Sequence, residues 1–165
     1  MAKRLILIRH AKSDWGNSDL RDFDRPLNKR GKANAPEMAE RLVNQQIIPD
    51  QIVSSPALRA ITTAKVFASA WQISTDQIKL EPNIYEANVR TLLSIVNNFD
   101  PKYNQIALFG HNPGLTDLVN YLAAHLDNIP TCGIVILEFP FDDWQMISAD
   151  TGKVLMFDYP KNGDD

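Results

Sequence analysis

The chain is poor in cysteine and has no long apolar run. Cys132 is the only cysteine, so an intrachain disulfide and any metal site built from several thiolates are excluded. The apolar run over residues 5–8 is too short for the core of a signal peptide or for a membrane span, and Arg9 ends it. We therefore expect a cytoplasmic protein without a membrane partner.

The chain also lacks an excess of positively charged over negatively charged residues. The 17 Lys and Arg residues are outnumbered by 20 Asp and Glu residues, which gives a formal charge of -3. Such a chain has no general attraction to nucleic acid or anionic lipid, so a site for an anion must be built locally. The sequence contains no repeat or low-complexity segment, and its 165 residues fit one domain, which we expect to span residues 1–165.

Short apolar runs alternate with stretches of helical periodicity, a pattern typical of βα units. Strands are expected at residues 5–8, 52–53, 78–80, 106–109, 134–139 and 154–157, with a further short strand around 144–147. Helices are expected after Asn28 as a cap, from Ser55, over residues 89–98 and over residues 115–122. The pattern predicts a three-layer α/β/α sandwich with a mainly parallel central sheet and an antiparallel edge strand.

Two histidines follow predicted strands directly. Arg9 and His10 come after the first apolar run, and His111 lies in the Gly-rich turn over residues 110–114. In open α/β sheets, ligands bind at the carboxyl ends of the strands, so we expect a site there. The long polar stretch over residues 11–26 is expected to rim that site, because long loops are usually functional or mobile.

Arg59 falls in the first turn of the helix that Ser55 and Pro56 are expected to open. Unpaired N–H groups and the positive dipole end favour an anion there, and a planar guanidinium matches the geometry of phosphate. The alternative is a salt bridge from Arg59 to the acidic residues of the 11–26 stretch. We expect Arg59 to converge with Arg9, His10 and His111 on one anion.

These segments together resemble the histidine phosphatase superfamily, whose fold is phosphoglycerate mutase-like. The resemblance rests on Arg9-His10-Ala11, on Ser-Pro-Ala-Leu-Arg-Ala at residues 55–60 and on Gly-His-Asn-Pro-Gly at residues 110–114. Residues 26–31 and 85–87 are also similar to family segments. The short chain and the opening over residues 9–15 are most similar to the SixA-type branch of phosphohistidine phosphatases. Ala11 replaces the glycine common after the Arg-His pair, which is a small change in volume.

The resemblance implies that His10 is the nucleophile and carries the phosphoryl group as a covalent intermediate, a role that a neutral imidazole can perform. Arg9, Arg59 and His111 would then surround the phosphoryl oxygens and offset their charge. On this account the reaction needs no metal and no cofactor.

Three further residues have assigned roles. Glu86 would be the general acid, with Asp14 from the first loop as the alternative. Ser13 and Asn112 would add hydrogen bonds to the phosphate, or else cap helices. Cys132 is assigned no chemistry, because an isolated cysteine is usually a small buried apolar residue.

The spacing between Glu86 and His111 leaves room for one helix and one strand but not for a large lid. An open groove favours a phosphorylated protein, with phosphohistidine as the substrate. The alternatives are a small-molecule phosphomonoester phosphatase of the same superfamily, a phosphoprotein-binding module without turnover, and a metal hydrolase. Adjacent arginines repel a divalent cation, which argues against the metal hydrolase.

Overall fold

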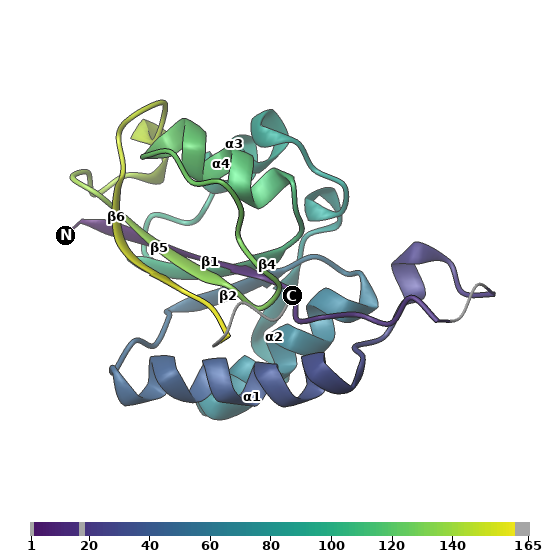
Figure 1. The fold of residues 1–165 in the computed structure, drawn as a ribbon. Helices are drawn as coiled ribbons and strands as arrows, with labels where there is room; N and C mark the ends of the chain where they lie inside the picture. The colour runs from purple at the N-terminus through teal and green to yellow at the C-terminus, as the bar shows by residue number, and fades with distance from the viewer. Residues whose placement is uncertain (1, 17–18, 161–165) are drawn as a thin grey trace.

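The computed structural model describes residues 2–16 and 19–160, and it has a six-stranded sheet with helices on both faces (Figure 1). Helices α1 (Lys29–Asn44) and α2 (Leu58–Ala70) cover one face, and α3 (Val89–Asn97) and α4 (Gly114–Leu122) cover the other. The predicted three-layer α/β/α sandwich is therefore confirmed.

The strand order is β3-β2-β4-β1-β5-β6. The strands are β1 (Lys3–Arg9), β2 (Gln51–Ser54), β3 (Ile78–Leu80), β4 (Gln105–Gly110), β5 (Ile134–Phe139) and β6 (Lys153–Asp158). The first four in this spatial order pair in parallel, whereas β5 is antiparallel to both β1 and β6. The expected antiparallel pairing thus lies on the β6 side of the sheet, with β6 at the edge.

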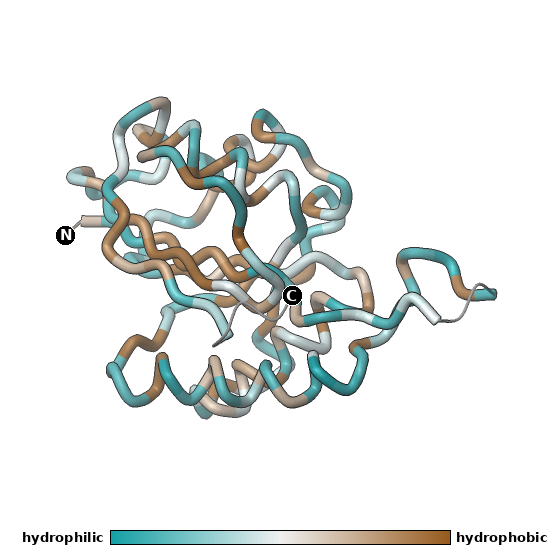
Figure 2. Tube along the Cα trace, in the orientation of Figure 1, coloured by the Kyte–Doolittle hydropathy of each residue, from teal (hydrophilic) through white to brown (hydrophobic). Residues whose placement is uncertain are grey.

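The core consists of two apolar clusters, one on each face of the sheet. In β1, Leu5 and Leu7 pack toward α3 and α4, whereas Ile6 and Ile8 pack toward α1 and α2. A strand covered on both faces needs apolar residues at every position, which explains the unbroken run before Arg9. Figure 2 shows this concentration of hydrophobic residues along the strands.

Helix α2 begins later than predicted. Its N-cap is Ala57 rather than Ser55, and the Ser55 hydroxyl instead accepts a hydrogen bond from the Ala57 N–H at 3.2 Å. The reason is that the Ser55 N–H still donates to Phe109 O at 3.0 Å, which keeps Ser55 in line with the strands. Arg59 nevertheless remains in the first turn of the helix.

The prediction of a short strand around residues 144–147 is wrong. Residues Trp144–Met146 form a 3-10 helix, η4, with the Asp143 carboxylate accepting from the Gln145 N–H. The Trp144 ring is fully buried and its Nε1 donates to Tyr103 O at 2.9 Å. Burial of this ring under α3 holds the chain in a compact turn. The loops among the described residues contain three other 3-10 helices: η1 (Asp22–Asp24), η2 (Thr75–Gln77) and η3 (Pro82–Ile84).

Residues 11–16 and 19–27 form a projecting segment between β1 and α1, visible at the right of Figure 1. Ser13 and Leu27 form an antiparallel bridge that joins its two ends. The predicted cap is present, because Asn28 Oδ1 accepts from the Gly31 N–H at 2.9 Å. Within the described residues, no helix is both long and apolar enough to cross a bilayer.

We predict that Gly31→Ala destabilises the protein despite the higher helix propensity of alanine. A Cβ at Gly31 would lie 2.1 Å from Lys12 O, and that carbonyl accepts from the Asn28 N–H at 3.0 Å. Backbone must therefore move, and overpacking of this kind costs roughly 1–3 kcal/mol. Urea denaturation measures the loss, and Lys32→Ala on the exposed side of α1 is the control. Equal stability of Gly31→Ala and the wild type would contradict the prediction.

Candidate active site

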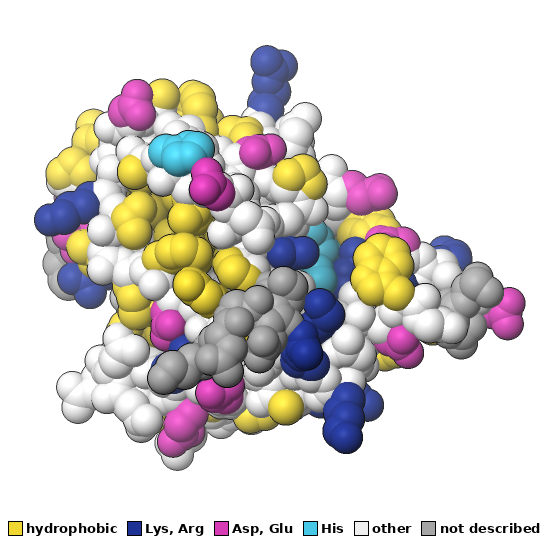
Figure 3. Space-filling model, viewed as in Figure 1, with side chains coloured by type: hydrophobic (Ala, Val, Ile, Leu, Met, Phe, Trp, Pro, Cys, Tyr) yellow, Lys and Arg dark blue, Asp and Glu magenta, His cyan; other side chains and the backbone are white. Residues whose placement is uncertain are grey.

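The carboxyl ends of β1, β2 and β4 open into one cavity of about 550 Å³. Because β4 lies between β1 and β2, the residues that follow these strands are neighbours. The four residues predicted to converge, Arg9, His10, Arg59 and His111, all line this cavity. In Figure 3, a histidine lies among Lys and Arg side chains where the projecting segment meets the body of the molecule.

His10 is buried in the cavity with a defined ring orientation. The Nδ1 atom of His10 lies 2.7 Å from the Ala11 carbonyl oxygen, and His10 as a whole is 7% exposed. Because a carbonyl oxygen only accepts, Nδ1 carries the hydrogen and donates it. The free electron pair of the ring therefore lies on Nε2.

The ring of His10 is neutral at physiological pH. Burial, together with smaller effects of the nearby His111, Arg59 and Arg9, lowers the pKa of His10 from 6.5 to about 3. The hydrogen bond to Ala11 opposes the shift. Nε2 therefore keeps the electron pair that a nucleophile needs.

Arg9 is the last residue of β1 and is tied to the loop that precedes β5. Its Nη1 donates to Ile129 O at 2.8 Å, and its N–H donates to Gly133 O at 3.1 Å. These contacts fix both the backbone and the guanidinium of Arg9. The charge is thereby held at the cavity, beside His10.

Arg59 is 6% exposed and faces the cavity from the start of α2. Its Nη1 donates to Asp22 O at 2.7 Å and its Nη2 to Asp22 Oδ2 at 3.0 Å. Arg59 Nε is buried without a hydrogen-bond partner, which costs free energy unless a ligand supplies an acceptor. Arg59 thus lines the cavity and also forms the salt bridge to the 11–26 stretch that was the alternative.

His111 offers a second buried donor. Its Nε2 lies 2.7 Å from Ser55 Oγ, and its Nδ1 is buried without a hydrogen-bond partner. Burial lowers the pKa of His111 to about 4, and Arg59 adds to the shift. Ser55 Oγ already accepts from the Ala57 N–H, and we assign its own hydrogen to His111 Nε2, so that the neutral ring carries its hydrogen on Nδ1. The rings of His10 and His111 lie 5.2 Å apart, centroid to centroid.

Asp22 is a central residue of the site that the sequence did not reveal. Its Oδ2 accepts from Tyr85 OH at 2.6 Å and from Arg59, and its Oδ1 accepts from Arg25 Nη2 at 3.0 Å. The hydrogen bond from Tyr85 lowers the pKa of Asp22 to about 2, with Arg59 contributing. The ionised carboxylate therefore ties the projecting segment to α2. The sequence indicated Asp22 only as one of several acidic residues in the 11–26 stretch with which Arg59 could form a salt bridge.

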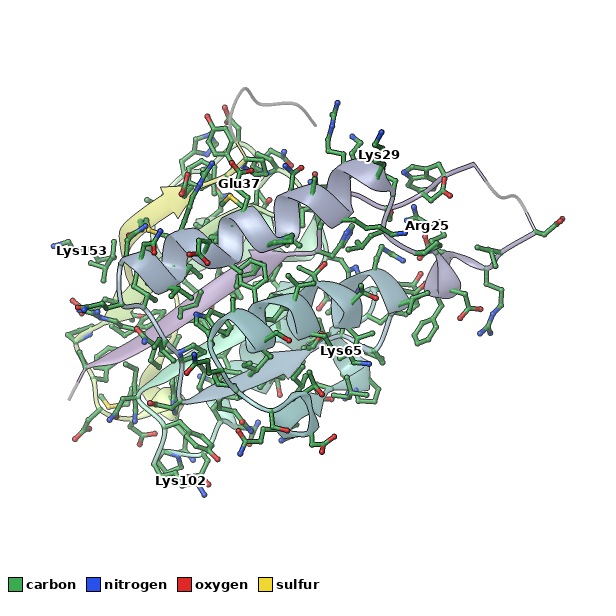
Figure 4. All side chains as sticks on the ribbon, turned by 90° about the horizontal axis from the view of Figure 1, so that it is seen from below. Arg25, Lys29, Glu37, Lys65, Lys102 and Lys153 are labelled. Carbon is green, nitrogen blue, oxygen red and sulfur yellow. The ribbon has the colours of Figure 1, made fainter. Side chains whose placement is uncertain are left out.

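Arg25 continues this network toward the cavity mouth. It is 7% exposed, and its Nη1 donates to Ser13 Oγ at 2.6 Å. Its guanidinium carbon lies 3.5 Å from the centroid of the Trp15 ring. Figure 4 shows Arg25 at the base of the projecting segment. Ser13, predicted as a phosphate contact, lines the cavity but already accepts from Arg25.

Glu86 lines the cavity and is exposed. Its φ of 59° places it in the left-handed region, which costs a non-glycine residue of order 1 kcal/mol and is often seen at functional sites. Asp14, the alternative acid, is not among the described residues that line the cavity, and its Oδ1 accepts from the Gly16 N–H at 2.7 Å. The geometry therefore favours Glu86 over Asp14.

Asn112 lines the cavity but its side chain is engaged in holding two loops together. Its Nδ2 donates to Asn128 Oδ1 at 3.0 Å and to Ile129 O at 2.9 Å. Its Oδ1 accepts from the N–H and hydroxyl of Thr116 in α4. These contacts correspond to the capping role that was the alternative for Asn112.

The donor set around the cavity is suited to an anion. Among the described residues, no group of three His, Cys, Asp or Glu side chains is arranged to hold a metal ion. Cys132 is buried and precedes β5, as expected of a structural residue. Buried guanidinium and imidazole N–H groups, by contrast, match the oxygens of a phosphoryl group.

A model of the histidine phosphatase superfamily (branch 1) matches residues 5–98 of the chain, which is more than half of its length. The chain belongs to the histidine phosphatase superfamily. The matched range includes Arg9, His10, Arg59 and Glu86. A chloroplastic protein of Arabidopsis thaliana, itself uncharacterized, is 30% identical over 160 residues, covering 92% of this chain and 73% of the relative.

Solved structures agree with this membership of the superfamily. The provisionally named phosphohistidine phosphatase SixA of Agrobacterium tumefaciens superposes with a TM-score of 0.82 at 28% identity, covering 97% of this chain and 99% of that one. A protein histidine phosphatase SixA complexed with tungstate superposes with a TM-score of 0.77 at 19% identity, and the match covers 95% of this chain and 97% of that one. The second likeness shows the shared fold.

Mutases of the superfamily match a smaller part. The 2,3-bisphosphoglycerate-dependent phosphoglycerate mutase of Arthrobacter sp. is 37% identical over 68 residues, or 40% of this chain and 27% of the mutase. The match to this mutase thus covers less than half of the chain. The resemblance to the superfamily and to SixA proteins that the motifs predicted is confirmed.

We predict that the protein loses stability as the pH falls from 6.5 to 4.5. His10 is neutral in the folded state over this range, because its pKa is about 3, but takes up a proton on unfolding. The unfolded state thus binds more protons, and His10 alone contributes a loss of about 2 kcal/mol. Urea denaturation at both pH values in the wild type and in His10→Gln measures this contribution.

The exposed residue His125 provides the control, since its side chain is 82% accessible. His125→Gln should keep the full wild-type loss of stability, whereas His10→Gln should lose less. A pH dependence that is the same in His10→Gln and in the wild type would contradict the assignment of a buried neutral His10.

Proposed function

We propose that the protein is a metal-independent phosphatase that hydrolyses protein phosphohistidine through a covalent phosphohistidine intermediate on His10. The observation that carries the proposal is the neutral, buried His10, whose Nε2 electron pair faces a cavity that Arg9, Arg59 and His111 also line. A nucleophile surrounded by donors for phosphoryl oxygens is what phosphoryl transfer requires.

In the first step, the Nε2 electron pair of His10 forms a bond to phosphorus. The bond from phosphorus to the substrate nitrogen breaks, and its electron pair stays on that nitrogen. Protonated Glu86, at the cavity mouth, supplies a proton to the leaving ring. Arg59 Nε and His111 Nδ1, both buried donors without a partner, receive the phosphoryl oxygens.

In the second step, water attacks the phosphorus of phosphorylated His10. The Glu86 carboxylate accepts a proton from that water, and the bond between phosphorus and Nε2 breaks with its electron pair returning to Nε2. Inorganic phosphate and neutral His10 result. Arg9 and Arg59 offset the negative charge of the transferred group in both steps.

The shape of the cavity supports a large substrate. Between Glu86 and His111, the chain contains α3 and β4, both of which belong to the α/β/α layers. Neither element forms a lid over the cavity, and α3 packs on the core through Leu92 and Val96. A phosphorylated side chain on the surface of another protein can enter such a site, whereas small-molecule mutases need closure to exclude water.

The test is to trap the intermediate. After rapid mixing with ³²P-labelled phosphorylated protein and acid or base quench, label should remain on His10 in base and be lost in acid. His10→Ala should carry no label and lack turnover, and EDTA should leave the wild-type rate unchanged.

Rates in His10→Ala that equal those of the wild type would overturn the proposal. Loss of activity on metal removal would favour the metal hydrolase instead. Turnover of aryl phosphate without any turnover of phosphohistidine would leave a small-molecule phosphatase as the activity.

The role of Glu86 as general acid has its own test. Glu86→Gln should lower kcat/KM, which reports only the first step, roughly 100-fold for an alkyl phosphate, whose leaving oxygen needs a proton, and far less for p-nitrophenyl phosphate. A series of aryl phosphates with leaving groups of increasing pKa measures the trend. Glu37→Gln on α1 is the matched control. A loss that is the same for every leaving group would exclude proton donation by Glu86.

A further inference from the structure

Trp15 is an exposed aromatic residue at the mouth of the cavity. It lines the same cavity as His10, but it is 77% exposed whereas His10 is 7% exposed. The other two tryptophans, Trp71 and Trp144, are 4% and 0% exposed. A ring as exposed as that of Trp15 contributes little to the core, so packing does not account for its position.

Contacts within the site hold Trp15 in place. The guanidinium carbon of Arg25 lies 3.5 Å from the centroid of the Trp15 ring. Arg25 is in turn fixed by Asp22 at 3.0 Å and by Ser13 at 2.6 Å, and Asp22 accepts from Arg59. A continuous chain of contacts therefore links the anion-binding Arg59 to the ring of Trp15. The ring is pre-organised, although most of its surface is open to solvent.

The direction of the reaction places the leaving group near Trp15. In an in-line transfer, the leaving group lies on the side of phosphorus opposite the attacking atom. Since His10 forms the buried part of the cavity, the leaving group points outward to the mouth. The exposed residues that line the cavity are Trp15, Asp22, Glu86 and Asn128. Of these four, Trp15 alone presents a flat apolar surface.

We propose that Trp15 is a specificity-determining residue that stacks on the planar ring of the leaving group, which is the imidazole of a phosphohistidine. The inference rests on the proposed function and names the part of the substrate that the enzyme recognises. Arg25 covers one face of the indole, and the imidazole would stack on the other face. A stacked aromatic pair corresponds to roughly a 2- to 10-fold gain in affinity.

The experiment compares the effect of each variant on two substrates, of which only one has a ring in its leaving group. N-phosphoimidazole and phosphoramidate both contain a bond between phosphorus and nitrogen, but phosphoramidate has no ring. Trp15→Ala should lower kcat/KM for N-phosphoimidazole roughly 3- to 10-fold and leave that for phosphoramidate within twofold of the wild type. Trp15→Phe, which keeps a ring, should restore most of the activity toward N-phosphoimidazole.

Leu20→Ala is the matched control, because Leu20 is also an exposed apolar residue of the projecting segment but is not among the residues that line the cavity. This variant should resemble the wild type with both substrates. An equal loss with both substrates in Trp15→Ala would mean that Trp15 only supports Arg25, and the proposal would be overturned. Unchanged kinetics with both substrates would overturn it as well.

A binding measurement separates this proposal from the proposed function. Phenylphosphonate and methylphosphonate are not hydrolysed, so calorimetry gives their affinities whether or not the protein cleaves a P–N bond. The wild type should bind phenylphosphonate more tightly, and Trp15→Ala should remove that preference. If neither P–N substrate is turned over, the proposed function fails. The ratio of the two phosphonate affinities then still decides the role of Trp15.

Discussion

The parallel pairing of β1, β4 and β2 is the constraint on which the site depends. Its hydrogen-bond ladder continues past the strands, where His10 N–H donates to Gly110 O at 3.1 Å and Ser55 N–H to Phe109 O at 3.0 Å. A shift in this register would move Ser55 away from His111 and His111 away from His10. The geometry of the proposed catalytic groups is therefore set by backbone hydrogen bonds within strands that are buried over most of their length.

Asp22 solves the problem of holding several cations together without a ligand. Arg25 and Arg59 are both buried, and their mutual repulsion would be costly in a medium of low dielectric constant. The ionised Asp22 carboxylate bonds to both guanidinium groups, and Tyr85 adds a third donor. Asp22 accepts hydrogen bonds from Nη1 and Nη2 of Arg59. The Nε of Arg59 makes no hydrogen bond and is left to donate to the proposed phosphoryl group.

The fold was predictable from the sequence wherever burial imposes a regular pattern of apolar residues on a strand or helix. The strands at residues 78–80 and 134–139 have the predicted bounds, because apolar runs between turns identify them. The histidines at strand ends were found for the same reason. Asp22 and Tyr85 were missed because 63 residues separate them, and the projecting segment has no periodicity to indicate where it folds back. The turn around Trp144 was misassigned because an apolar run does not show which side chain is buried.

Burial gives His10 a protonation state suited to attack before any substrate arrives. The desolvation that lowers its pKa to about 3 keeps Nε2 unprotonated, and the neighbouring arginines act in the same direction. A bound phosphoryl dianion brings negative charge among these groups, which opposes the effect of the arginines on both histidines. The Nδ1 hydrogen bond of His10 to Ala11 still directs the electron pair of Nε2 toward the cavity. The arrangement thus separates two requirements of the proposed nucleophile, since burial sets its charge and a single backbone carbonyl sets its direction.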